Sequence, residues 1–223
     1  MSKAVFDVII PCNTKDEYTR VITEQSLKSL RNSKNENVEF HVVVMEQNAR
    51  AERFELADET IVYTFPFNYN KVLNEGAKRT HGEYVLLANN DLIYCDGFAD
   101  ALLRVFKAGY KSLSPTSPSQ SSYSPQMVIE GYGINSVLNG WCIAAERKML
   151  ESIGYLDESV VFWYSDNIYA CQLKHAHIKH ARVSNSYVFH LGSSTLKKAD
   201  SSVKQDYTNQ QKNVFEEAAK KYE

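Results

Sequence analysis

The stretch GEYVLLANNDLIY, residues 82–94, decides the fold class of this chain. Residues 84–88 (YVLLA) form a short apolar run, and such a run predicts a strand that is buried on both faces. The run stops at Asn89, Asn90 and Asp91, three short polar side chains. Asn and Asp at a strand end often bond their own backbone, so this motif alone favours a turn over a site.

The same pattern of a buried strand followed by a helix repeats through the first half of the chain. A capping box at residues 14–17 (TKDE) predicts the start of one helix, and Asn70 is expected to cap another. Apolar strands are predicted at residues 5–10, 40–45, 59–64 and 84–88. Buried strands joined by helices indicate an α/β fold with a mostly parallel central sheet flanked by helices.

The second half is more mixed, and we predict that it completes one domain rather than forming another. Residues 114–126, rich in Ser and Pro, predict a surface loop. Further elements are expected as a strand at 140–145, a short helix at 147–153, a strand at 187–190 and an amphipathic C-terminal helix at about 203–222. The chain is therefore predicted to be a single domain, residues 1–223.

Polar residues end three of the four predicted strands of the first half. They are Asn13, Glu46 with Asn48, and the run from Asn89 to Asp91. Ligands of open α/β sheets bind outside the carboxyl ends of the strands, so we expect these residues to converge on one rim. Asp91 offers a hard oxygen ligand for Mg²⁺ or Mn²⁺, which in turn would bind diphosphate oxygens.

Asp166 and His190 are two further candidates. Asp166 follows an aromatic run at residues 160–164 and precedes a predicted helix, so it reads as an ordinary N-cap, as a general base, or as both. His190 ends an aromatic strand, where a lone histidine is more often structural than a ligand. The histidines of KHAHIKHAR, residues 174–182, are interpreted as a solvated helix end and turn, because no acidic residue or cysteine accompanies them.

Composition and missing motifs narrow the function classes. The chain has 25 basic and 27 acidic residues and a net charge of −2, which disfavours a DNA-coating protein. It has no GxGxxG, P-loop or GxSxG motif, which disfavours a dehydrogenase, an NTPase or a serine hydrolase. No apolar run reaches about 18 residues, so no transmembrane helix is expected, and the first residues lack a secretory layout. Four cysteines without CxxC spacing are expected to be reduced thiols of a cytosolic protein.

Three blocks of the chain, taken in order, resemble family 2 glycosyltransferases, which have the GT-A fold. The opening block is VIIPCNTKDEYTRVITEQSLKSL, and the second, FNYNKVLNEGAKRTHGEYVLLANNDLIY, resembles the block with the DxD-type motif. The third block, residues 140–195, begins with GWCIAAERKMLESIGYLDES and ends with VFHLGSST. The resemblance spans most of residues 5–195, and the joint order is more specific than any single block.

The resemblance implies a nucleotide-binding half at about residues 1–113, an acceptor-binding and catalytic half at about residues 114–200, and a role for each matching residue. Asp166 would be the catalytic base, Asp91 and His190 would hold Mn²⁺ or Mg²⁺, and Trp141 and Trp163 would contact sugar or acceptor. The residues expected to bind the nucleotide sugar are Pro11, Asn13, Glu46, Asn48, Asn70, Asn89, Asn90 and Asp91.

Three positions depart from the family pattern. Asn89 replaces the first Asp of the DxD-type motif, which lowers the negative charge there. Glu46 stands where the family often has an Asp that contacts the base, and Ser165 stands where it often has Glu. The departures at Asn89 and Glu46 leave the identity of the donor open.

The implied function is an inverting, metal-assisted hexosyl- or pentosyltransferase that uses a nucleotide-diphosphate sugar. The expected acceptor is a cell-surface or lipid-linked glycan, and the expected location is the cytoplasm or the membrane periphery. One alternative is a soluble phage-type transferase that glycosylates a modified DNA base. Its candidate DNA contacts are Lys174, Lys179, His180, Arg182, Lys197 and Lys198. The other alternative is a glycosyltransferase-like domain that binds nucleotide or glycan without turnover.

Overall fold

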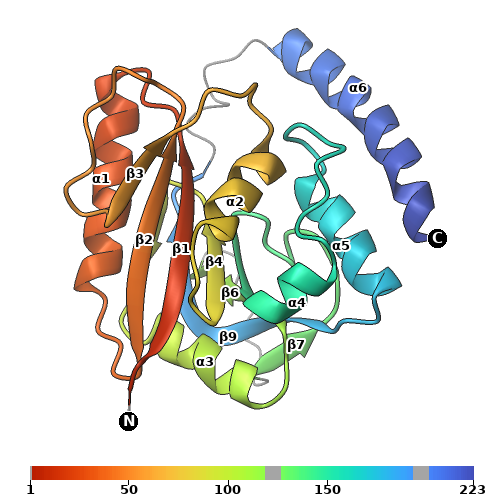
Figure 1. Cartoon of the computed structure of the whole chain (residues 1–223). Helices are drawn as coiled ribbons and strands as arrows, with labels where there is room; N and C mark the ends of the chain where they lie inside the picture. Colours follow the sequence, from red (N-terminus) through yellow and green to blue (C-terminus); the bar gives the residue numbers. More distant parts are fainter. Residues whose placement is uncertain (1, 119–126, 193–200) are drawn as a thin grey trace.

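Strand β1 (Ala4–Cys12) lies inside a nine-stranded sheet whose order is β3-β2-β1-β4-β8-β6-β9-β5, with β7 paired to β9. The computed structural model describes residues 2–118, 127–192 and 201–223, and the side chains of these residues except 201–209. The first-half strands β2 (Val38–Glu46), β3 (Glu59–Val62) and β4 (Tyr84–Ala88) join β1 in a parallel unit (Figure 1). This unit confirms the four strands predicted from the first half of the sequence.

The second half of the chain extends this unit with shorter and mostly antiparallel pairings. Strand β8 (Cys142–Glu146) pairs antiparallel with β4 and with β6 (Ser112–Thr116), and β6 runs parallel to β9 (His180–His190). Strands β5 (Leu92–Tyr94) and β7 (Val128–Glu130) pair antiparallel with β9. The chain is therefore one mixed α/β domain, as predicted, while its division into a nucleotide half and an acceptor half stays a prediction.

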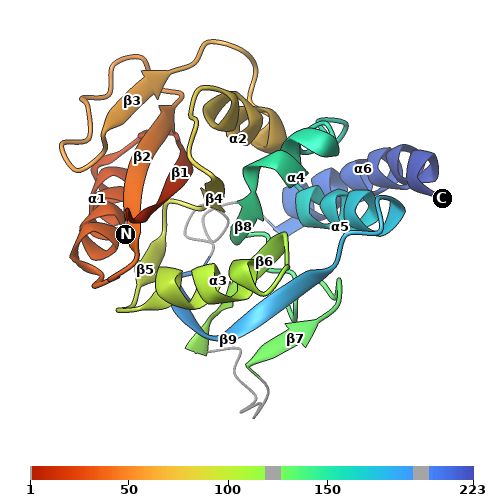
Figure 2. The ribbon, with the colours of Figure 1, turned by 60° about the horizontal axis from the view of Figure 1, so that its bottom comes forward.

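Helices cover both faces of the sheet because its strands are apolar on both sides. Val8 and Ile10 of β1 face α1 (Glu17–Asn32) and α3 (Phe98–Lys107), whereas Ile9 faces the opposite cluster. That second cluster contains residues of α2 (Tyr69–Lys78), α4 (Arg147–Ser152) and α5 (Ser165–His175). Figure 2 shows α1 and α3 apart from α2, α4 and α5.

The predicted C-terminal helix is present as α6 (Ser201–Ala219), followed by the short helix η2 (Lys220–Tyr222). Helix α6 lies outside the layers of the sheet, beside α5 (Figure 1). No helix in the described part of the chain has both the length and the apolar character needed to span a bilayer.

Several local predictions were wrong. Asp16, not Thr14, is the N-cap of α1, and its side chain accepts a hydrogen bond from the amide of Thr19. Asn68, not Asn70, caps α2. Residues 114–116 of the predicted loop form part of β6, while residues 119–126 lie outside the described ones. Strand β9 begins at His180, seven residues before the strand predicted at 187–190. The interpretation of His180 as part of a solvated helix end and turn is therefore wrong.

Candidate functional site

A cavity of about 570 Å³ opens at the carboxyl ends of β1 and β4. Of the predicted site residues, six line it: Pro11, Asn13, Asn89, Asn90, Asp91 and His190. The remaining lining residues are Cys12, Lys15, Thr19, Gln47, Phe67, Tyr69 and Phe162. Two of the three predicted polar strand ends therefore meet in one place, as expected for the rim of an α/β sheet.

Asp91 and His190 come together because β5 pairs with the end of β9. The register places Leu92 opposite His190, and the amide of Leu191 donates to the carbonyl of Asp91 at 3.0 Å. The Asp91 Oδ1 atom lies 3.3 Å from His190 Nε2, yet this buried oxygen accepts no well-directed hydrogen bond from any described residue. Two ligand atoms thus face the same space.

This pair of side chains fits a divalent cation that is shared with a bound phosphate. A buried carboxylate oxygen without a partner is costly, and a cation would remove that cost. The described residues contain no cluster of three or more His, Cys, Asp or Glu side chains suited to a metal. A cation here would therefore have two protein ligands, and diphosphate and water oxygens would supply the others, which is how Mg²⁺ is often bound.

Trp141 contacts both His190 and Asn89, the residue two positions before Asp91. Its ring stacks on the His190 imidazole with centroids 5.4 Å apart, and its carbonyl accepts from the amide of Asn89 at 2.9 Å. Trp141 is buried and does not line the cavity. Trp163 is also absent from the lining and packs edge-on against Phe162.

Tyr69 fixes Asn89, the first residue of the run from Asn89 to Asp91. Its hydroxyl donates to Asn89 Oδ1 at 2.7 Å and also lies 3.4 Å from the carbonyl oxygen of Gly140. Burial raises the pKa of Tyr69, so the hydroxyl stays protonated and able to donate. Because Asn89 Oδ1 accepts from Tyr69 and the Asn89 backbone amide donates to Trp141, the side-chain Nδ2 group of Asn89 is the part left for a ligand. Asn90 is held separately, since its Nδ2 donates to Thr23 Oγ1 at 2.9 Å.

Glu46 and Asn48 hold the loop after β1 and are not lining residues. The buried Glu46 carboxylate accepts from the amide of Thr14 at 3.0 Å, from its hydroxyl at 2.6 Å and from the amide of Asn48 at 2.7 Å. The Asn48 side chain donates to the carbonyl of Thr14 at 2.6 Å. Gln47, the first residue after β2, does line the cavity, and its side chain accepts from Asn13 Nδ2 at 2.7 Å.

Asn70 belongs to a set of three asparagines, the N-cap and two residues of α2, that bind the backbone of the segment before α5. Asn70 donates to the carbonyl of Asp157 at 2.6 Å, and neither atom faces the cavity lining. Asn68 donates to the carbonyls of Glu158 and Val160, and Asn74 donates to the carbonyl of Leu156. The spacing NYNKVLN was visible in the sequence, but its partner segment lies more than 80 residues away.

Asp166 lies in the first turn of α5 and is not the N-cap, which is Tyr164. It packs against Gly140 so closely that a Cβ there would lie 2.8 Å from Asp166 Oδ2. The amide of Asn167 donates to its Oδ1 at 2.9 Å, and burial raises the pKa of the Asp166 carboxyl. Asp166 is not a lining residue of the cavity, but it contacts Gly140, whose carbonyl oxygen lies beside the Tyr69 hydroxyl.

Seven lining residues were missed, and their signals in the sequence differ. Gln47 stands between two predicted residues, and Lys15 and Thr19 follow the first strand, so their position was informative. Phe67 and Phe162 are 95 positions apart and meet only through the fold, with ring centroids 6.1 Å apart. No spacing in the sequence reveals such a pair.

Two of the basic residues proposed as DNA contacts are buried. His180 is 1% exposed and Arg182 is 6% exposed, and Arg182 donates to the carbonyl of Ser136. Burial lowers the pKa of His180 to about 4, so it is neutral at pH 7. Lys197 and Lys198 lie outside the described residues.

No protein-family model matches the sequence, and no curated protein matches it. Solved structures do match the fold. Residues 1–349 of S. aureus TarS match with a TM-score of 0.60 and 16% identity, over 84% of this chain and 59% of that one. The mannosyltransferase PcManGT from Pyrobaculum calidifontis, solved with GDP-Man and Mn²⁺, matches with a TM-score of 0.64 and 14% identity, over 87% and 59%.

A third structure, GalNAc-T7 with UDP, GalNAc and Mn²⁺, matches with a TM-score of 0.67 and 11% identity, over 84% of this chain and 44% of that one. The chain thus spans between 44% and 59% of the length of these three structures. At these identities the likeness shows the fold alone. The chain has the GT-A fold that its sequence predicted.

Proposed function

We propose that this chain is a metal-assisted glycosyltransferase that moves a hexose or pentose from a nucleotide-diphosphate sugar to an acceptor hydroxyl, as in family 2. The observation behind the proposal is the buried Asp91 Oδ1, which accepts no hydrogen bond from the described residues and faces His190 Nε2 in a cavity at the carboxyl ends of β1 and β4. Two structures of similar fold were solved with Mn²⁺ and with GDP-Man or UDP, which supports the same ligand class here.

The donor would bind along the cavity rim. Pro11, Asn13 and Gln47 line the end formed by β1 and β2, where we place the nucleoside. The side-chain Nδ2 group of Asn89 and the ammonium group of Lys15 would donate hydrogen bonds to the diphosphate oxygens. A bound Mn²⁺ or Mg²⁺ held by Asp91 and His190 would neutralise charge on the leaving diphosphate.

Asp166 would act as the general base. It takes the proton from the acceptor hydroxyl as the hydroxyl oxygen forms a bond to the anomeric carbon and the bond from that carbon to the diphosphate oxygen breaks. The products are the glycosylated acceptor, the nucleoside diphosphate and a proton on Asp166. One displacement inverts the anomeric configuration. Burial of the Asp166 carboxyl raises its pKa, which makes the carboxylate a stronger base.

A glycan acceptor is proposed ahead of a modified DNA base, because two of the six basic contact candidates are buried. DNA affinity that does not change with salt would count further against the DNA base. The expected cytoplasmic or membrane-peripheral location is part of the same proposal.

The test is a panel of nucleotide sugars incubated with the chain and Mn²⁺, and then with EDTA. Transfer or hydrolysis of one donor that EDTA abolishes is the expected result. Donor binding without any turnover would identify a non-catalytic binding domain instead. If no donor binds or reacts and EDTA has no effect, the proposed function is wrong.

The base assignment has its own test. Asp166→Asn should keep the nucleotide-diphosphate affinity and lower turnover by about 10²–10⁴-fold. The exposed Asp96→Asn is the matched control and should change neither quantity. Near-normal turnover of Asp166→Asn would show that another group accepts the proton.

A further inference from the structure

The segment that leads into α5, residues 156–164, connects the cavity with the proposed base. Phe162 of this segment lines the cavity, and Asp166 follows two residues after its end. The three α2 asparagines described above hold one side of its backbone. The other side of its backbone is held by α6 and η2, whose residues are far along the sequence from those that line the cavity.

The C-terminal contacts begin at Asp157. Tyr222 Oη donates to Asp157 Oδ2 at 2.6 Å, and Lys221 pairs with the same oxygen. Lys221 Nζ also donates to Ser159 Oγ at 3.3 Å. These partners lower the pKa of Asp157 to about 2, so the contact is formed throughout the neutral range. They attach the end of the chain to the start of segment 156–164.

Gln211 of α6 contacts the middle of the segment. This buried side chain accepts a hydrogen bond from the amide of Val161 at 3.1 Å, and the carbonyl of Val161 accepts from the amide of Tyr69 at 2.7 Å. The ring of the next residue, Phe162, packs edge-on against Tyr69 with centroids 5.8 Å apart. Gln211 is therefore two hydrogen bonds from the tyrosine that holds Asn89.

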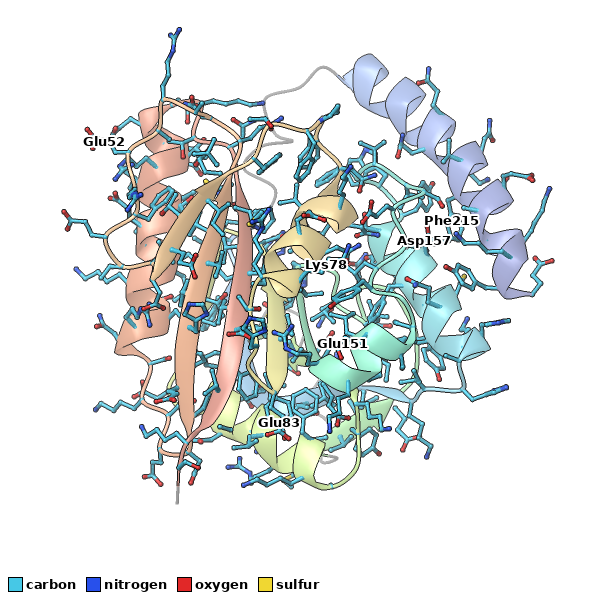
Figure 3. The ribbon with its side chains drawn as sticks, viewed as in Figure 1. Glu52, Lys78, Glu83, Glu151, Asp157 and Phe215 are labelled. Atoms are coloured by element: carbon cyan, nitrogen blue, oxygen red, sulfur yellow. The ribbon has the colours of Figure 1, made fainter. Side chains whose placement is uncertain are left out.

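Phe215 of α6 contacts the end of the segment. Its ring stacks on Tyr164 with centroids 5.1 Å apart and an interplanar angle of 8°. Tyr164 has φ of +66°, a left-handed conformation that costs a non-glycine residue energy and persists only where neighbours hold it. Figure 3 labels Phe215 on α6 and Asp157 in the segment before α5. Tyr164 is the N-cap of α5, and Asp166 follows it by two residues.

We infer that α6 and η2 form a brace with two separable effects: Gln211 positions the Tyr69–Phe162 wall of the donor cavity, and Phe215 positions Asp166 through Tyr164. Both are positioning residues that touch no reacting atom. The inference rests on the proposed function for its kinetic part, and on the contacts alone for its structural part.

The kinetic experiment separates the two effects in the full chain. UDP and GDP are titrated, each with Mn²⁺, to find which binds, and transfer is measured with the matching sugar donor. Phe215→Ala should lower kcat by about a hundredfold, because misplacing a catalytic group by about 1 Å has that effect, and leave the nucleotide Kd within about twofold. Gln211→Ala should raise that Kd by about tenfold, the equivalent of one hydrogen bond, with little change in kcat.

Two further variants separate positioning from simple loss of stability. Phe215→Tyr keeps the stacked ring and should restore kcat, whereas a helix that only stabilises the fold has no such preference for a ring. Val214→Ala changes the neighbouring, 42% exposed side chain of the same helix and should leave kcat and Kd unchanged. If Phe215→Ala lowers kcat and raises the nucleotide Kd by the same factor, the separation of the two effects is wrong.

Hydrogen exchange of backbone amides tests the brace without any substrate. Phe215→Ala should speed exchange at the amide of Ile168, which donates to the Tyr164 carbonyl, and Gln211→Ala should speed it at Val161 and Tyr69, with the β1 amides unchanged. Unchanged exchange at these positions would overturn the brace. Failure of every nucleotide to bind the wild-type chain would overturn the proposed function but leave this result standing.

Discussion

Asp7 and Asp91 are two buried aspartates of the same sheet with opposite surroundings. Asp7 lies in β1 with a side chain 2% exposed, and Asp91 lies just after β4 with a side chain 8% exposed. Asp7 accepts from Arg147 Nη2 at 2.5 Å and from the amide of Gly82 at 2.6 Å, and its other oxygen lies 3.1 Å from His41 Nδ1. Asp91 Oδ1 lies 3.3 Å from His190 Nε2 but has no hydrogen-bond partner among the described residues.

The difference separates a carboxylate that stabilises the fold from one that can bind a ligand. The partners of Asp7 come from β2, β4's leading turn and the start of α4, so its carboxylate ties separate elements together. Arg147 is equally committed, since it also donates to the carbonyls of Gly82 and Ala77 and to Thr80 Oγ1. A complete partner set makes a buried charge a source of stability, whereas an incomplete set leaves a position for a ligand.

The largest effect is expected for Asp7→Ala. Removing this carboxylate leaves the mostly buried Arg147 charge, whose side chain is 11% exposed, without its carboxylate, so the free energy of unfolding should fall by about 3–5 kcal/mol. Urea denaturation measures this change. The exposed Asp96→Ala should cost less than about 1 kcal/mol. If the two variants are equally stable, the hydrogen bonds of Asp7 do not stabilise the fold as proposed.

Asp91→Asn should behave in the opposite way. It removes a buried charge that has no full set of partners, so the free energy of unfolding should stay the same or rise. Nucleotide-diphosphate binding in Mn²⁺ should weaken at least about a hundredfold, or about 2.7 kcal/mol, because a proposed metal ligand is lost. Calorimetric titration with and without EDTA measures the binding. A loss of stability like that of Asp7→Ala would erase the contrast between the two aspartates.

Trp141→Leu should give a smaller effect at the same site. Leucine keeps the buried apolar volume in part and leaves the backbone carbonyl for Asn89, but it removes the ring stacked on His190. Mn²⁺ affinity should fall by about tenfold, as for other groups that orient metal ligands. Trp163→Phe is the matched control, and an equal loss in both variants would contradict the role of Trp141.

The smallest effect is the pH dependence of turnover through Asp166. Burial raises its pKa, so the base becomes protonated, and kcat falls, at a pH above the usual value of about 3.9. The same shift has a sign for stability: a folded pKa above the unfolded one gives stability that is present at low pH and lost as pH rises through the folded pKa. Asp166→Asn should therefore be slightly more stable at pH 7. An acid limb of kcat that persists in Asp166→Asn would belong to another group.

The sequence was most informative where a residue's surroundings depend on its own segment. Strands covered on both faces must be apolar at consecutive positions, so residues 5–10, 40–45 and 84–88 were readable as buried strands. The carboxyl ends of parallel strands share one edge, so Asn13 and the run from Asn89 to Asp91 were readable as neighbours.

It was least informative where a distant partner decides. Glu46, Asn48 and Asn70 are polar residues in plausible positions, but their hydrogen bonds to Thr14 and Asp157 appear only in the fold. Strands β5 and β7 have three residues each, too few for a periodic pattern, and both exist because β9 offers them an edge. His180 could not be recognised as buried without that same strand.

The stack of Trp141 on His190 also makes the site optically observable. The chain has two tryptophans, and one of them lies against a proposed ligand of a paramagnetic ion. Mn²⁺ quenches the fluorescence of a ring this close, so in Trp163→Phe the emission of the single remaining indole reports occupancy directly. Metal affinity then becomes measurable in a cuvette before any donor sugar or acceptor is known.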